Sequence, residues 1–216
     1  MSNLNVTNIQ HESGAGDNLR LAADGTTTIP GGTNRPQIAG YQQGIFTPSM
    51  YGYNATWGTY SKQEGTYSRV GQTVYITMYV GAPNTNSSSS AVLISGFPYE
   101  ASKSIGTVYN SADIGYALRI NTPKSFTAYL DGLSRISLVI LGTNDTSVSP
   151  LPCTAFSDGS SRVILSCNYI TDDITWQPIN GAAPQGTSEY AEIKAAQAAV
   201  SAAYVAANPS AIEELP

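Results

Sequence analysis

A short alternation of apolar and polar side chains places the strongest constraint on the fold of this chain. Over residues 74–80, valine, isoleucine and methionine occupy every second position, with tyrosine or threonine between them. A period of two is that of a β-strand with one face turned to a core. Comparable short strands are expected at residues 91–95, 105–109, 115–120, 126–130, 135–141 and 162–170. Turn-forming residues separate these segments without a helical period, which predicts an antiparallel β-sandwich or jelly-roll-like domain over residues 40–180.

Both ends of the chain differ from this central domain. Residues 1–36 contain short apolar alternations interrupted by glycine-rich turns, so we expect an extended arm. Strands this short cannot bury a face by themselves, and the arm should pair with another chain or dock on a partner. The alternative is a flexible terminus without a partner. Residues 186–216 hold the one strong helix signal, rich in alanine, followed by an acidic tail of unknown purpose.

A stripe of larger side chains runs along the predicted helix. Its members are three or four residues apart, as in the seam of a coiled coil: Tyr190, Ile193, Gln197, Val200 and Tyr204. The pattern spans only about two heptads. Two interpretations therefore stay open. The stripe is a self-association seam, or it is the buried face of one helix that lies on its own domain.

Charge and hydropathy restrict the partners. The chain has 10 Lys and Arg against 15 Asp and Glu, a net charge of −5, and no basic cluster that could neutralise a phosphate track. We therefore expect no nucleic-acid binding. The sequence has no apolar run of about 18 residues, so membrane insertion is not expected. The first residues lack a basic segment and an apolar stretch, which predicts synthesis and folding in a cytoplasm without a signal peptide.

Residues for catalysis or metal binding are scarce. The one histidine, His11, falls in the arm, whereas a Ser-His-Asp triad needs a rigidly oriented base. One histidine and two distant cysteines do not match the short ligand spacing of a metal site. Asp172 and Asp173 are adjacent, so in a strand they would point to opposite faces and not form the carboxylate pair of a glycosidase. We expect no enzyme activity, no cofactor and no metal.

The two cysteines allow two interpretations. Asp158 and Gly159 have the character of a hairpin tip, and a turn there would place Cys153 opposite Cys167. Directly opposed strand residues can lie close enough for a disulfide. The alternative is two buried thiols that pack as small apolar groups, which folding in a cytoplasm favours.

An aromatic-rich segment is the candidate recognition surface. Its tyrosines and tryptophan alternate with glycine, asparagine and threonine: Tyr51, Tyr53, Trp57 and Tyr60. Exposed aromatic rings of this kind can stack on sugar rings while the polar neighbours bind hydroxyl groups. The same residues can equally serve as core or subunit-interface anchors, and we favour that interpretation.

Two motif segments resemble a known module. The first is Gly44-Ile45-Phe46-Thr47-Pro48, and the second is Gly65-Thr66-Tyr67-Ser68-Arg69-Val70-Gly71, which leads into the alternating strand. Together they resemble a module common in bacteriophage tail fibres and other virion appendages, over about residues 44–100. The resemblance implies a virion structural protein, made in the host cytoplasm and located in the tail or another appendage.

The same resemblance sets expectations for partners. It implies a homotrimer that attaches to other virion proteins through its N-terminal arm and contributes to host-surface recognition, with a host cell-surface glycan as a candidate ligand. Two alternatives remain. The chain could be a head decoration or fibre-to-tail adaptor without receptor contact, or a monomeric carbohydrate-binding module.

Overall fold

The computed structural model divides the chain into two compact units, residues 1–40 and 41–216. It describes residues 8–9, 19–21, 27–28, 40–86, 88–104, 110–121, 125–131, 134–141 and 148–208. The first unit contains a small antiparallel sheet in the order β1-β2-β3, formed by β1 (Asn8–Ile9), β2 (Leu19–Leu21) and β3 (Thr27–Thr28). His11, the predicted strand at 105–109 and the acidic tail lie outside the described residues.

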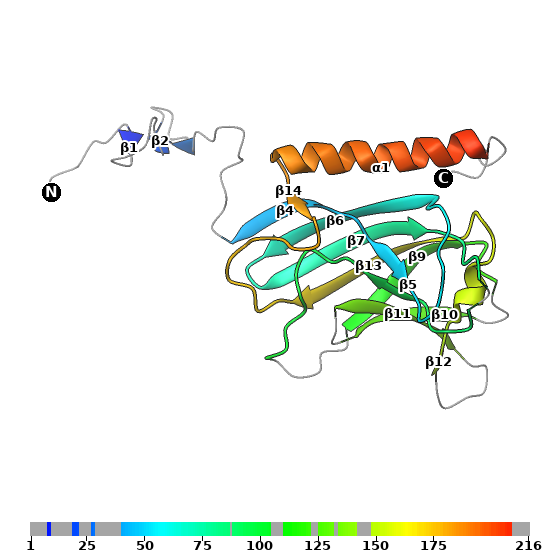
Figure 1. The fold of residues 1–216 in the computed structure, drawn as a ribbon. Helices are drawn as coiled ribbons and strands as arrows, with labels where there is room; N and C mark the ends of the chain where they lie inside the picture. Colours follow the sequence, from blue (N-terminus) through cyan, green and yellow to red (C-terminus); the bar gives the residue numbers. More distant parts are fainter. Residues whose placement is uncertain are drawn as a thin grey trace, which may run out of the picture. The chain divides into compact units, whose positions relative to one another are not determined.

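One antiparallel sheet forms the body of the second unit (Figure 1). Its strands are β4 (Tyr41–Phe46), β5 (Ser49–Tyr51), β6 (Lys62–Val70), β7 (Thr73–Gly81), β8 (Leu93–Ser95), β9 (Asn110–Leu118), β10 (Phe126–Asp131), β11 (Arg135–Leu141), β12 (Val148–Pro150), β13 (Arg162–Ile170) and β14 (Ala183–Pro184). The order across the sheet is β14-β4-β6-β7-β13-β9-β10-β11-β8-β5, with β12 paired to β11. A short 3-10 helix, η1 (Cys153–Phe156), and one α-helix, α1 (Ser188–Ala207), complete the described elements.

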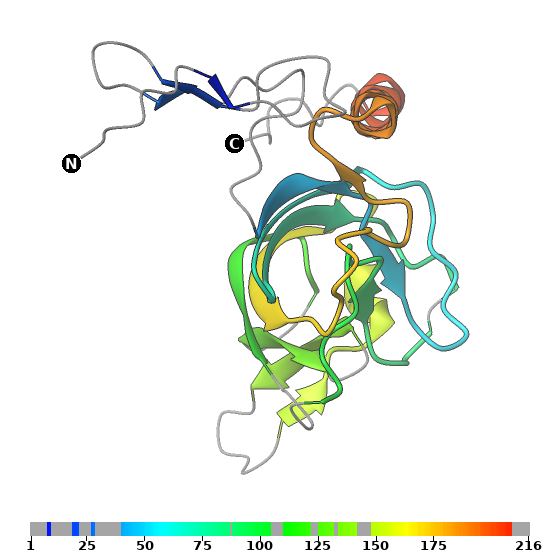
Figure 2. The same cartoon turned by 90° about the vertical axis from the view of Figure 1, so that its left-hand side faces the viewer.

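The predicted fold class, mainly antiparallel β with a C-terminal helix, is confirmed. The sheet curls around its own core, as Figure 2 shows, so the layers expected of a sandwich belong to one continuous sheet. The alternation in β7 accounts for the inner layer, because Val74, Ile76, Met78 and Val80 are all buried. On β13 their directly paired partners are Tyr169, Cys167, Leu165 and Val163, which are buried too.

The strands that the sequence did not indicate as separate elements lack an apolar alternation. On β6 the inward positions hold Gly65, Tyr67 and Arg69, and the outward positions hold polar side chains except at the last residue, Val70. Such a strand has no apolar stripe, although all nine of its residues pair with β7. Strand β9 begins at Asn110 instead of the predicted residue 115, and in its first half the exposed positions hold the polar residues Ser111 and Asp113.

The C-terminal helix α1 begins shortly after the last strand of the sheet, β14. Thr187 caps α1, because its Oγ1 accepts a hydrogen bond of 3.2 Å from the backbone N–H of Tyr190. Glu189 lies in the first turn, where a carboxylate suits the positive end of the helix. The helix runs beside β14, β4 and β6 and ends at Ala207, one residue before Asn208 (Figure 1).

Candidate ligand-binding groove

The motif glycines permit strands and rings to approach closely. A Cβ atom on Gly44 would lie 2.2 Å from the backbone oxygen of Ala183 and 2.6 Å from the ring of Tyr67. A Cβ atom on Gly65 would lie 2.7 Å from the ring of Phe46. These two positions join β14, β4 and β6, and a side chain at either would push them apart.

The motif arginine has a structural role as well. Arg69 is 1% exposed, and its Nη1 lies 2.6 Å from Oδ2 of Asp173. Its guanidinium carbon lies 4.5 Å from the ring centre of Tyr99 and 3.9 Å from that of Trp176. Nε donates a 2.9 Å hydrogen bond to the backbone oxygen of Gly71 at the β6–β7 turn. The guanidinium therefore fastens the segment after β13 to the β6–β7 hairpin.

The candidate aromatic residues divide into two pairs. Tyr51 and Tyr53 project from the surface, with 49% and 72% of their area exposed. Trp57 packs edge-on against Phe156 with ring centres 5.9 Å apart. The hydroxyl of Tyr60 accepts a 2.9 Å hydrogen bond from the backbone N–H of Met50, and burial raises the pKa of Tyr60. Two of the four rings thus support the core, and two are exposed at the surface.

The hairpin expected between the cysteines is not formed. Cys153 lies in η1, whereas Cys167 on β13 pairs with Ile76 on β7 and Ala112 on β9. The prediction that Cys153 opposes Cys167 was therefore wrong, because the segment before Asp158 turns into a 3-10 helix instead of a strand. Both cysteines are free and buried, and burial raises the pKa of Cys167 to about 11.

The adjacent carboxylates Asp172 and Asp173 accept hydrogen bonds from nearby loop residues. Asp172 accepts hydrogen bonds from the hydroxyls of Ser104 and Ser102 and from the backbone N–H of Lys103, which lower its pKa to about 2. Burial alone would raise the pKa of Asp173, but hydrogen bonds from Thr175 and Arg69 outweigh it, so this pKa is lowered. Among the described residues, no group of three or more His, Cys, Asp or Glu is placed to hold a metal ion.

The helix stripe faces the sheet of its own chain. Its five members are half-buried or buried, as are Ser201 and Val205, and Tyr204 is 8% exposed. Gln197 Nε2 donates a 2.9 Å hydrogen bond to the backbone oxygen of Phe46, and the hydroxyls of Tyr204 and Ser160 lie 2.9 Å apart. Of the two interpretations left open by the sequence, this arrangement corresponds to a helix lying on its own domain.

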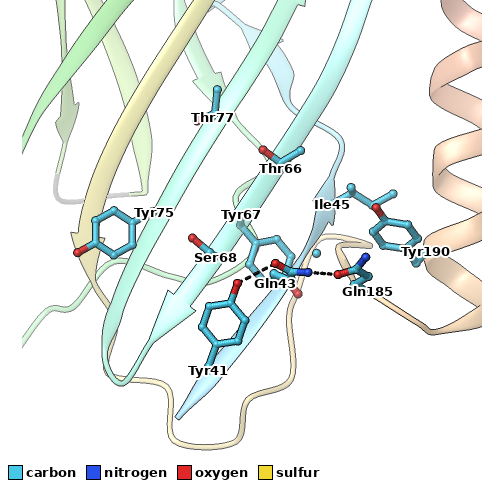
Figure 3. A pocket seen from close by; sticks show the side chains of 11 residues that line it. Tyr41, Gln43, Ile45, Thr66, Tyr67, Ser68, Tyr75, Thr77, Gln185 and Tyr190 are labelled. Carbon is cyan, nitrogen blue, oxygen red and sulfur yellow. Dashed lines mark hydrogen bonds between the residues drawn. The ribbon is translucent and has the colours of Figure 1, made fainter. Parts of the chain in front are cut away.

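A groove of about 390 Å³ lies where the start of α1 meets the outer face of the sheet (Figure 3). Its floor comes from the outward positions of β4, β6 and β7. Tyr190 and Gln185 stand on one side, and Tyr41 lies near the end of the floor, as Figure 3 shows. The Tyr41 hydroxyl donates a 2.7 Å hydrogen bond to Oε1 of Gln43, and Nε2 of Gln43 donates to Oε1 of Gln185.

The strand register sets the order of side chains on the floor. Gln43 pairs with Ser68, and Ser68 pairs with Tyr75, so these three form one row across β4, β6 and β7. Ile45, Thr66 and Thr77 form the next row in the same way. None of the residues that line the groove is charged. The arrangement offers hydroxyl, amide and aromatic groups, which suits a neutral polar ligand.

The sequence identified only part of this groove. The alternation at 74–80 places Tyr75 and Thr77 on the face opposite the core. The strands beside them carry no comparable signal, and the position of Gln185 and Tyr190 depends on the return of the chain to β4 through β14. The groove thus depends on the pairing of strands that are far apart in the sequence, which a local sequence pattern does not predict.

Comparisons with known proteins support the fold alone. No protein-family model matches the chain, and no curated protein matches it in sequence. The crystal structure of the Dettilon tailspike protein is similar to it with a TM-score of 0.50 and 15% sequence identity. The similar region covers 60% of this chain and 24% of the tailspike chain. About three fifths of this chain therefore corresponds in fold to about a quarter of that protein.

Among the residues that the structure describes, no helix combines the length and apolar character needed to cross a lipid bilayer.

Proposed function

We propose that this protein is a structural subunit of a bacteriophage tail appendage, a tail fibre or a similar organelle. The observation that carries the proposal is the fold shared with part of a tailspike protein. The motif resemblance over residues 44–100 points to the same class of protein. The motif residues Gly44, Gly65 and Arg69 serve the fold, so the resemblance supports the architecture of the module.

The division of the chain into two units suggests how it works. Residues 1–40 form a unit of their own, with strands only two or three residues long. Strands this short need a partner surface. In the proposal this arm attaches the subunit to other virion proteins, and the β-domain contributes to recognition of the host surface. The subunits assemble as a homotrimer, so that weak contacts repeated across copies give useful avidity.

The proposed role is binding without catalysis. Asp172 and Asp173, the adjacent carboxylates with lowered pKa, are each committed to a loop by several hydrogen bonds. A carboxyl group that acts as a general acid needs a raised pKa instead. The lowered pKa of both carboxyl groups therefore supports a binding role for this part of the chain.

Reconstitution on particles tests the proposal. Virions made without this protein are mixed with the purified full-length chain, separated on a gradient, and examined for bound protein by immunoblot. The full-length chain should co-migrate with particles, and a variant lacking residues 1–36 should not. A matched control, Tyr53→Ala in the β-domain, should attach like the wild type. Failure of the full-length chain to bind would refute the appendage role, and equal binding of the deletion variant would refute the arm as anchor.

A further inference from the structure

The groove of Figure 3 continues across the sheet as a polar lane. A second depression of about 190 Å³ lies over β7, β13 and β9 and shares Tyr75 and Thr77 with the groove. We propose that this lane binds an uncharged oligosaccharide that lies across the strands. The proposal deepens the proposed role in host-surface recognition and rests on it for its biological context.

The register makes the lane continuous. One row of outward side chains runs Gln43, Ser68, Tyr75 and Asn168, from β4 to β13. The parallel row contains Thr66, Thr77 and Ser166 on β6, β7 and β13. Strands lie about 4.8 Å apart, so five strands from β4 to β9 give a lane about 19 Å long. That length accommodates several linked sugar rings.

The chemistry of the lane suits sugar hydroxyls. Hydroxyl and amide groups both donate and accept hydrogen bonds, as sugar hydroxyls do. Within the described part of the chain, the hydroxyls of Thr66, Ser68 and Tyr75 have no side-chain partner, so a ligand can bind them without breaking a bond. Tyr75 is 48% exposed and lies in both depressions, where its ring offers an apolar face to a sugar ring.

Charge and geometry disfavour other occupants. The two depressions together are lined by one charged residue, Asp113, at the β9 end. A nucleic acid or an acidic glycan needs cationic side chains to offset its charge, and the lane has none. An extended peptide gains affinity by adding to a sheet edge, whereas the lane is the face of paired strands.

A matched pair of tyrosine variants tests the lane. The full-length protein is applied to an array of neutral and acidic bacterial surface oligosaccharides, and the best neutral ligand is then titrated by calorimetry. Tyr75→Ala should weaken its binding roughly tenfold or more, which corresponds to about 1.4 kcal/mol. Tyr53→Ala removes an even more exposed ring outside the lane and should change the affinity less than about twofold. Asn168→Ala serves as a second lane variant, and thermal unfolding verifies that each variant folds.

The outcomes separate the lane from the proposed function. Loss of binding in the Tyr75 and Asn168 variants, with Tyr53→Ala unaffected, would support the lane. Binding of acidic glycans only, no binding of any neutral glycan, or loss in Tyr53→Ala alone would overturn it. A lower oligomer mass for the lane variants would also overturn it, because the lane would then be a subunit interface. None of these results bears on whether the protein attaches to particles, so the appendage role stands or fails separately.

Discussion

At the scale of single residues, Arg69 shows how a charged side chain can be buried inside this domain. Its guanidinium is enclosed by two aromatic rings and paired with Asp173, so the cost of burying the charge is offset by an ion pair, hydrogen bonds and ring contacts. The sequence displays the arginine in a motif, but its partners Tyr99, Asp173 and Trp176 lie far from it along the chain, Asp173 by 104 residues. A local pattern could not have revealed that the side chain is internal.

Removing this guanidinium should therefore be costly. Arg69→Ala leaves the Asp173 carboxylate without its cation, and we expect the free energy of unfolding to fall by about 3–5 kcal/mol. The control is Lys103→Ala, which breaks an ion pair with Glu100 whose side chains are 67% and 66% exposed. That change should cost less than about 1 kcal/mol. Urea unfolding measures both, and equal losses would show that Arg69 is not a structural link.

The motif glycines provide a second comparison. Gly44→Ala places a methyl group 2.2 Å from the backbone oxygen of Ala183, so β14 or Tyr67 must shift, and we expect a loss of about 1–3 kcal/mol. Gly159→Ala is the matched control, since a Cβ there meets nothing within 4 Å. It should change stability by less than about 0.5 kcal/mol. Similar unfolding midpoints in urea for the two variants would contradict the close approach of β4 and β14.

Asp172 makes the stability depend on acid pH. Its pKa is lowered from 3.8 to about 2 by hydrogen bonds from Ser104, Ser102 and the backbone of Lys103. A lowered pKa stabilises the fold above the ordinary value, and that contribution disappears as the pH falls from about 4 to about 2. The melting temperature should drop across this window, and Asp172→Asn should reduce the drop. An identical pH profile in the variant would show that the carboxylate contributes nothing.

At the scale of elements, the strand β7 and the helix α1 were the easiest to predict. Both carry an uninterrupted local period, of two in β7 and of three to four in α1. Strands β4 and β6, which form most of the groove floor, were not predicted as separate elements, because glycine and arginine occupy inward positions where apolar side chains would have signalled a strand. The groove was therefore missed along with them.

The helix stripe illustrates what periodicity leaves open. A spacing of three and four residues indicates that one face of the helix is buried. It does not indicate which surface covers that face. Here that surface is the sheet of the same chain, through contacts such as Gln197 with Phe46 and Ser201 with Glu64. Tyr204 is the buried member, and its hydroxyl lies 2.9 Å from that of Ser160.

Truncating Tyr204 tests this placement. Tyr204→Ala should lower the free energy of unfolding by about 1–3 kcal/mol, through the lost ring packing and hydrogen bond. It should leave the oligomer mass unchanged, because the stripe contacts its own domain. Lys194→Ala, on the exposed side of the same helix, should leave both unchanged. Light scattering measures the mass. Dissociation of the oligomer in Tyr204→Ala would instead show that the stripe is a contact between subunits.

At the scale of the whole molecule, the proposed role requires assembly. Light scattering on the full-length protein should give a mass three times the 22.7 kDa of the chain. Weak contacts that single sites make with a surface become useful when three copies act together. A monomer would contradict the homotrimer and would favour the module that binds carbohydrate alone.

The most direct test of the central claim is to locate the protein on intact virions. Gold-labelled antibody against the β-domain is applied to purified particles and imaged by electron microscopy, with particles from a gene-disrupted stock as the control. The proposal predicts label at the tail of wild-type particles and none on the control. Label on the head, or no label on intact particles that contain the gene, would contradict the tail-appendage role.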